Sequence, residues 1–219
     1  MVHKLIVTAV VLVSLFALPA SDLQALAAER PLRIVALGDS LTAGYGLSAQ
    51  DSFPAQLERA LKAKGHAVEI ENAGVSGDTA SGGLARLDWA VPDGTDAVIV
   101  ELGANDMLRG VDPKTTRAAL DNLLGRLKQR GVEVLFAGMR AAPNLGAEYG
   151  HAFEKLFADL AAKYDVVYYP FFLDGIAAQT KLALRDGMHP NVDGVKEIVT
   201  GILPKAEELI ARIKAKQNG

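Results

Sequence analysis

Ser40 is the first residue of this chain whose setting suggests chemistry. It lies in Gly38-Asp39-Ser40-Leu41, where the short apolar run Arg33–Leu37 ends. A serine hydroxyl is a weak nucleophile until a neighbouring base removes its proton. Ser40 is therefore a candidate nucleophile only if another part of the sequence supplies that base.

His189 is the best candidate for the base, and it lies in the segment DGMHPN, residues 186–191. Asp186 can accept the second imidazole N–H and so fix the tautomer of His189. Pro190 and Asn191 favour the start of a helix directly afterwards. The alternative interpretation is a plain loop in which the aspartate and the asparagine only satisfy that helix start.

Hydrolysis through an acyl-enzyme also needs donors for the oxyanion that develops on the attacked carbonyl. The segment Asn72–Thr79 can present a backbone N–H, and Gly103–Asp106 can present the side-chain amide of Asn105. Each segment can also be read as a tight turn that needs glycine torsions. Their common place after apolar runs favours the functional interpretation.

Composition excludes several other kinds of site. The chain has 219 residues, a formal net charge of -3 and no cysteine. The charge gives no reason to expect a nucleic acid or an anionic membrane as partner, and the lack of cysteine excludes disulfides and thiolate chemistry. His66 and His151 are expected on the surface, so no spaced set of metal ligands is predicted.

The first residues differ from the rest of the chain. Lys4 precedes the apolar run Leu5–Leu18, and Ala25-Leu26-Ala27 offers a small-residue cleavage pattern. This arrangement predicts a signal peptide over residues 1–28 and one domain over residues 29–219. The mature protein is then expected to be periplasmic or secreted, without a stable membrane anchor; an uncleaved anchor is the alternative, although the run is short for a span.

Beyond residue 30, strand and helix patterns alternate, which predicts an α/β fold with a five-stranded parallel sheet and helices on both faces. The result is a three-layer, flavodoxin-like sandwich, with its site beyond the carboxyl ends of the strands. The expected strands are 33–37, 68–71, 97–102, 132–137 and 166–169. The expected helices are 53–64, 84–90, 113–129, 152–163 and 192–214, the last interrupted near Pro204.

Four segments, GDSLTAGYG, NAGVSGDTASGGLARL, VIVELGANDMLRG and DGMHPN, resemble the four sequence blocks of the SGNH/GDSL hydrolases, above all the secreted arylesterase, thioesterase and lysophospholipase members. The resemblance implies the SGNH hydrolase fold, no cofactor and a monomer. It implies Ser40 as nucleophile, with Asp186 and His189 completing a triad. It also implies an oxyanion hole formed by Ser40, Gly77 and Asn105. The implied substrates are small-molecule esters or thioesters with an acyl chain.

The acyl chain is expected beside the loop Met139–Tyr149, which the resemblance sets next to the substrate; the alternative is a surface connection. The candidate substrate-binding residues are Met107, Met139, Pro143, Tyr149 and Met188. The chain departs from a close relative at Gly74, where serine is expected, and at Ala104 and Met107, where glycine is expected. These departures leave every catalytic group in place and can reshape the acyl pocket.

Other functions remain as alternatives. A carbohydrate (acetyl) esterase on the same scaffold would need a small acyl pocket with polar walls. A nucleotide-binding protein is indicated by Gly44-Tyr45-Gly46-Leu47-Ser48-Ala49, which fits G-x-G-x-x-G/A, but these glycines neither follow the strand directly nor open a helix. An α/β-hydrolase is disfavoured because the chain has no G-x-S-x-G pentad. Trp89 is expected to pack in the core.

Overall fold

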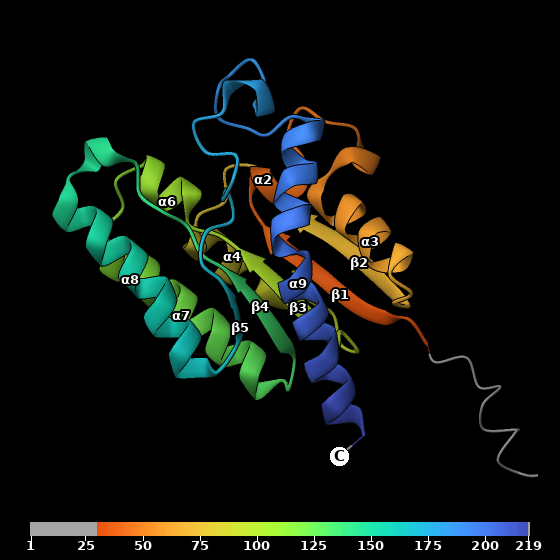
Figure 1. The fold of residues 1–219 in the computed structure, drawn as a ribbon. Coiled ribbons are helices and arrows are strands. Elements are labelled where there is room, and N and C mark those ends of the chain that lie inside the picture. The colour runs from red at the N-terminus through yellow and green to blue at the C-terminus, as the bar shows by residue number, and fades with distance from the viewer. Residues whose placement is uncertain (1–29, 219) are drawn as a thin grey trace, which may run out of the picture. The chain divides into compact units, whose positions relative to one another are not determined.

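Five short apolar segments form a parallel sheet in the order β2-β1-β3-β4-β5 (Figure 1). The strands are β1 (Leu32–Gly38), β2 (Val68–Gly74), β3 (Ala97–Glu101), β4 (Glu133–Ala137) and β5 (Val167–Tyr169). The computed structural model describes residues 30–218, and the predicted signal peptide over residues 1–28 lies outside them. The fold is the flavodoxin-like α/β sandwich that the alternating pattern predicts.

The central strands are covered on both faces, and their sequences follow from that position. All five residues of β3 and four of the five in β4 are buried, as are six of the seven in β1. In an α/β sheet both sides of a central strand face helices, so the strand is a continuous apolar run and does not alternate. The edge strand β2 has only Val68 buried.

Helices cover the sheet on both sides (Figure 1). The helices α3 (Phe53–Ala63) and α9 (Val192–Gln217) pack together on one face, and α4 (Ala80–Ala85), α7 (Pro113–Gln129) and α8 (Ala147–Tyr164) pack on the other. The short helices are α2 (Ser40–Ala43), α5 (Leu87–Ala90) and α6 (Ala104–Leu108). The single turns η1 (Ala49–Asp51), η2 (Pro143–Leu145) and η3 (Thr180–Leu182) complete the described elements.

Helix α9 corrects one expectation, because it continues through Pro204 without interruption. A proline inside a helix removes one hydrogen bond and costs about 3 kcal/mol. The buried face of α9 extends on both sides of that position, with Ile198 and Ile202 before it and Leu209 and Ile213 after it. Burial of this face offsets the local cost of the proline.

The region around residues 80–90 corrects two more expectations. One helix was expected over residues 84–90, whereas α4 ends at Ala85 and α5 begins at Leu87. Arg86 separates them, and its side chain turns inward to the end of β1. Trp89 is 80% exposed, because Leu87 and Ala90 form the buried side of the single turn of α5.

Other boundaries shift by a few residues; α8, for example, begins five residues before the expected start at Ala152. None of the helices within residues 30–218 combines the length and the apolar character needed to cross a membrane.

The strand order reverses between β1 and β3, since β2 follows β1 in sequence but lies on its other side. The connections that leave β1 and β3 therefore cross to opposite faces of the sheet and leave a crevice between them. Gly38 pairs with Glu101 at the carboxyl ends of these two strands. Ser40 and Asn105, which follow these two strands, therefore lie at this crevice.

Candidate active site

Ser40 opens the one-turn helix α2 directly beyond the end of β1. Asp39 caps this helix, and its Oδ1 accepts a hydrogen bond from the backbone N–H of Leu41 at 2.9 Å. The chain passes so close to β3 at Gly38 that a Cβ there would lie 2.1 Å from Thr42 Oγ1 and 2.7 Å from the Glu101 carbonyl oxygen. Only glycine allows the turn that brings Ser40 to the sheet edge.

His189 lies on a loop that is fixed at its base. Ala183 and Pro190 form an antiparallel bridge, and the Leu184 N–H donates to the His189 carbonyl at 2.7 Å. The side chain of Asn191 caps α9, as expected, and donates a hydrogen bond to the Lys181 carbonyl at 2.9 Å. These bonds hold the residues between 184 and 189 over the crevice.

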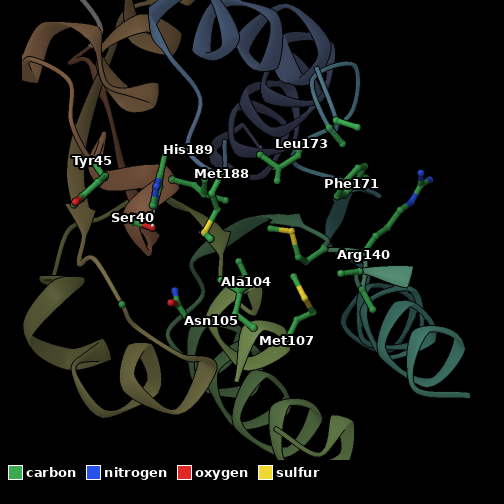
Figure 2. A pocket seen from close by; sticks show the side chains of 18 of the residues that line it. Ser40, Tyr45, Ala104, Asn105, Met107, Arg140, Phe171, Leu173, Met188 and His189 are labelled. Carbon is green, nitrogen blue, oxygen red and sulfur yellow. Dashed lines mark hydrogen bonds between the residues drawn. The ribbon is translucent and has the colours of Figure 1, made fainter. Parts of the chain in front are cut away.

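The fold brings Ser40, His189 and Asp186 together from two ends of the chain. His189 Nε2 lies 2.9 Å from Ser40 Oγ, and His189 Nδ1 lies 2.7 Å from Asp186 Oδ2. Figure 2 shows the imidazole directly beside Ser40. The second carboxylate oxygen of Asp186 accepts the backbone N–H groups of Met188 and His189.

These bonds determine which nitrogen of the imidazole carries the proton. The backbone N–H of His189, that of Met188 and the imidazole itself lower the pKa of Asp186 to about 2. An ionised carboxylate only accepts hydrogen bonds, so Nδ1 of His189 carries the proton. Nε2 is then free to accept the Ser40 hydroxyl proton, which is the arrangement that activates a serine.

Asn105 lies in α6, which is fixed through its buried neighbour Asp106. The carboxylate of Asp106 accepts from the Ala80 N–H at 2.8 Å and from Thr116 Oγ1 at 2.9 Å. Asn105 Nδ2 donates one proton to Asp39 Oδ2 at 2.9 Å. The amide of Asn105 is therefore held beside the segment that carries Ser40.

Three N–H groups remain available at the crevice. Within residues 30–218, no acceptor meets the second amide proton of Asn105 or the backbone N–H groups of Ser40 and Gly77. The Gly77 carbonyl is held by Arg109 Nη2 at 2.8 Å, and Arg86 Nη2 holds the Gly38 carbonyl at 2.9 Å. Both arginines thus fix loops. The arrangement can stabilise a negative oxygen beside Ser40 Oγ.

Two buried acids lie behind Ser40. Asp39 and Glu101 are both fully shielded from solvent, and Glu101 Oε2 accepts a hydrogen bond from Thr42 Oγ1 at 2.7 Å. Burial raises the pKa of Asp39 to about 6, against the lowering effect of the N–H groups of Leu41 and Asn105. Burial and the neighbouring Asp39 raise the pKa of Glu101 well above its usual value. The site therefore contains a carboxylate that is costly to ionise.

An apolar cavity of about 570 Å³ opens beside Ser40 (Figure 2). Its volume lies in the range of small-molecule sites. Apart from Ser40, Asn105, His189 and Arg140, the labelled side chains in Figure 2 are apolar or aromatic. Its larger apolar walls are Leu41, Met107, Leu108, Met139, Phe171, Leu173 and Met188. Such walls suit a hydrocarbon chain.

Four of the five expected substrate-binding residues line this cavity: Met107, Met139, Pro143 and Met188. Tyr149 does not, and that expectation is wrong. Its hydroxyl donates to the Val111 carbonyl at 2.9 Å, and its ring stacks on Phe153. Tyr149 lies in the first turn of α8, and its side chain connects α8 to the loop before α7 instead of lining the cavity.

Sequence reasoning missed several residues of the site. Phe171 and Leu173 line the cavity, and the available signal was the apolar segment PFFLDGI directly after β5. Asp39 was missed as the partner of Asn105, although an acid next to the candidate nucleophile can indicate a buried interaction. Tyr45, which lies against His189, had no signal except its place between two glycines.

The alternative of a nucleotide site loses its basis in the fold. Gly44 ends α2 in the left-handed conformation, and the next α-helix begins only at Phe53. The glycines therefore do not open a helix towards a phosphate. Within residues 30–218, no group of three or more His, Cys, Asp or Glu side chains is arranged to hold a metal ion.

Known proteins resemble this chain in both sequence and fold. Residues 36–196 match the GDSL-like Lipase/Acylhydrolase family. The chain is 35% identical to an arylesterase of Vibrio mimicus over 85% of this chain and 92% of the relative. It is 36% identical to thioesterase 1/protease 1/lysophospholipase L1 of Escherichia coli K12, over 81% of this chain and 84% of the relative. The crystal structure of AlinE4, an SGNH-hydrolase family esterase, superposes with a TM-score of 0.71 at 43% identity, covering 83% of this chain and 98% of that one.

The raised pKa of Asp39 predicts a pH-dependent stability. The folded state holds this proton up to about pH 6, and the usual value is 3.8, so unfolding releases a proton between these values. The stability contribution of Asp39 therefore falls as the pH rises from about 4 to about 6, by on the order of 3 kcal/mol. Asp39→Asn removes this titration, so its unfolding free energy in urea should rise relative to wild type over that interval.

A constant offset between the unfolding free energies of the two proteins is also expected, because Leu41 and Asn105 donate to different oxygens of Asp39 and asparagine keeps only one of them. The control is Asp93→Asn, at a fully exposed aspartate that lies 3.7 Å from Arg130 Nη2. If the plots of unfolding free energy against pH stay parallel for Asp39→Asn and wild type between pH 4 and pH 7, the buried-acid interpretation is contradicted.

Proposed function

The chain belongs to the GDSL-like lipase/acylhydrolase family and is an ester-hydrolysing enzyme, and we propose that Ser40 is its nucleophile, His189 its general base and Asp186 the carboxylate that orients the base. The observation that carries the proposal is the 2.9 Å contact of His189 Nε2 with Ser40 Oγ. The 2.7 Å contact of Nδ1 with Asp186 supports it, because it leaves Nε2 as the acceptor.

In the proposed first half-reaction, Ser40 Oγ attacks the carbonyl carbon of an ester or thioester while its proton passes to His189 Nε2. The carbonyl oxygen becomes an oxyanion, and the N–H groups of Ser40 and Gly77 and the amide of Asn105 donate to it. Collapse of this intermediate breaks the bond to the alcohol or thiol. The leaving group takes the proton from His189, and the acyl group stays on Ser40.

In the second half-reaction, His189 removes a proton from water, which attacks the acyl-enzyme from the side that the leaving group has vacated. The same donors hold the second oxyanion. The free acid departs, and the proton returns from His189 to Ser40 Oγ. All of these groups come from one chain, so the proposal needs no second subunit and no cofactor.

The cavity beside Ser40 favours substrates with longer acyl chains over acetylated sugars. A sugar deacetylase needs a small acyl pocket with polar walls, whereas this cavity of about 570 Å³ is bounded mainly by apolar groups. Esters and thioesters of longer acyl chains, including arylesters and lysophospholipids, are the proposed substrates. Met107, Met139, Pro143 and Met188 are the proposed contacts of the acyl chain.

The proposed nucleophile predicts the effect of Ser40→Ala on hydrolysis of p-nitrophenyl esters from acetyl to palmitoyl. The folded variant should lose activity by at least about a thousandfold, because no other group can form the acyl-enzyme. Ser81→Ala, at an exposed position in α4, is the matched control and should match wild type. Equal activity of Ser40→Ala and wild type would overturn the proposal, and a preference for acetyl alone would favour the sugar esterase.

The proposed oxyanion hole predicts that Asn105→Ala lowers kcat by on the order of 10²–10³ while the protein folds normally. Asn122→Ala, an exposed asparagine on α7, removes the same amide and should leave kcat unchanged. Steady-state kinetics on one ester give kcat for all three proteins. Near wild-type kcat in Asn105→Ala would remove Asn105 from the mechanism.

We further propose that the protein is exported, on the basis of Lys4, the apolar run Leu5–Leu18 and the Ala25-Leu26-Ala27 pattern. Expression of the full chain in a bacterial host should yield a mature protein that begins at Ala28 or Glu29, as read by intact mass. A variant that combines Ala25→Glu and Ala27→Glu should keep the signal peptide. A wild-type chain that retains residue 1 would contradict the cleavage.

A further inference from the structure

Tyr45 packs against the imidazole of His189. The two ring centroids are 4.5 Å apart, and the ring planes are tilted by 36°. Figure 2 shows Tyr45 on one side of His189, next to Ser40. Tyr45 is 53% exposed, so the core does not require an aromatic ring at this position. Exposed rings are common at protein surfaces, so the case for a role of Tyr45 depends on what its ring contacts.

The backbone ties Tyr45 to Ser40 itself. The N–H groups of Gly44 and Tyr45 both donate to the Ser40 carbonyl, at 3.2 and 3.1 Å. Gly44 has a φ of 80°, which ends the one-turn helix and directs the chain towards the loop that carries His189. The backbone of Tyr45 is thus held close to the proposed nucleophile.

The next residue connects the same segment to the loop that carries His189. Gly46 has a φ of 75°, and a Cβ there would lie 2.8 Å from Leu184 Cδ1. The Leu184 N–H in turn donates to the His189 carbonyl. Residues 44–46 therefore contact both strands at the base of the loop, Gly46 at Leu184 and the ring of Tyr45 at His189.

The hydrogen bonds to Asp186 and Ser40 do not hold the faces of the imidazole, and because the His189 side chain is only 16% exposed, neighbouring groups such as the Tyr45 ring cover those faces. Asp186 and Ser40 contact the two nitrogens at the ring edge, and the side chain of Asp186 is 38% exposed. Met188, which precedes His189, is 54% exposed. Edge contacts fix the direction of the nitrogens, whereas a tilt of the ring is opposed only by groups against its faces.

The ring of Tyr45, and not its hydroxyl, makes this contact. Within residues 30–218 the hydroxyl takes part in no hydrogen bond. The face of an aromatic ring carries partial negative charge, so it favours a positive partner. His189 becomes positive when it takes the proton of Ser40.

We propose that Tyr45 is a positioning residue that holds the imidazole of His189 in line with Ser40 Oγ through ring packing; this inference rests on the proposed roles of Ser40 and His189. Tyr45 does not transfer a proton. It restricts the tilt of the imidazole, and the face of its ring attracts the positive charge that forms there during attack.

The test compares Tyr45→Leu with Tyr45→Phe in hydrolysis of a p-nitrophenyl ester. Tyr45→Leu should lower kcat by about threefold to tenfold, the range that a ring pair contributes, with KM changed by less than about twofold. Tyr45→Phe keeps the ring and should restore kcat to within about twofold of wild type. Trp89→Leu removes a more exposed aromatic ring that does not line the cavity and should leave kcat unchanged.

A second readout concerns the free enzyme. In ¹⁵N-labelled protein, the proton on His189 Nδ1 should exchange faster with solvent in Tyr45→Leu than in wild type or Tyr45→Phe, because the tilting ring loosens its bond to Asp186. Equal exchange in all three proteins, a kcat equal to wild type in Tyr45→Leu, or an equal loss of kcat in both Tyr45 variants would overturn the inference.

A rise in KM alone would also overturn it, because Tyr45 would then be only a wall of the substrate cavity. These outcomes are distinct from failure of the proposed function, which shows as activity retained in Ser40→Ala.

Discussion

The reversal of strand order between β1 and β3 is the constraint on which the rest of this site depends. Chains leaving two neighbouring parallel strands towards opposite faces cannot cover the sheet edge between them. Ser40 follows β1 and Asn105 follows β3, so both groups lie at that uncovered edge. His189 comes to the same edge from a loop 149 residues beyond Ser40 in sequence. The crevice is therefore a consequence of the strand order and does not depend on these side chains.

The two acids buried behind Ser40 stabilise the folded state less than apolar side chains in the same place would. Asp39 is fully buried, with the acid Glu101 beside it, and its ionisation is opposed by burial. Asp39 nonetheless accepts from both Leu41 and Asn105, and so joins the helix that carries Ser40 to the amide at the crevice. A neutral apolar residue would remove this link. The fold thus accepts a local cost in stability where it fixes two elements of the site.

The sequence predicted the layers of the fold because burial leaves a direct pattern. The continuous apolar runs of β1, β3 and β4 and the capped pattern of α7 require no knowledge of the partners they pack against. Predictions were wrong where tertiary contacts outweigh local preference. Helix α9 continues through Pro204 because its buried face extends on both sides, and the expected helix over residues 84–90 is broken because Arg86 turns inward to Gly38.

The same division holds for the site. The residue types and order of Ser40, Asn105, Asp186 and His189 were readable from the sequence, because acyl transfer needs particular groups after particular strands. Their distances were not readable, and neither were the partners that orient them. Asp39 meets Asn105, and Tyr45 meets His189, across 66 and more than 140 residues of chain. Contacts between distant segments depend on how the helices and loops pack, so the sequence determined which groups are present and only the tertiary structure decided which of them meet.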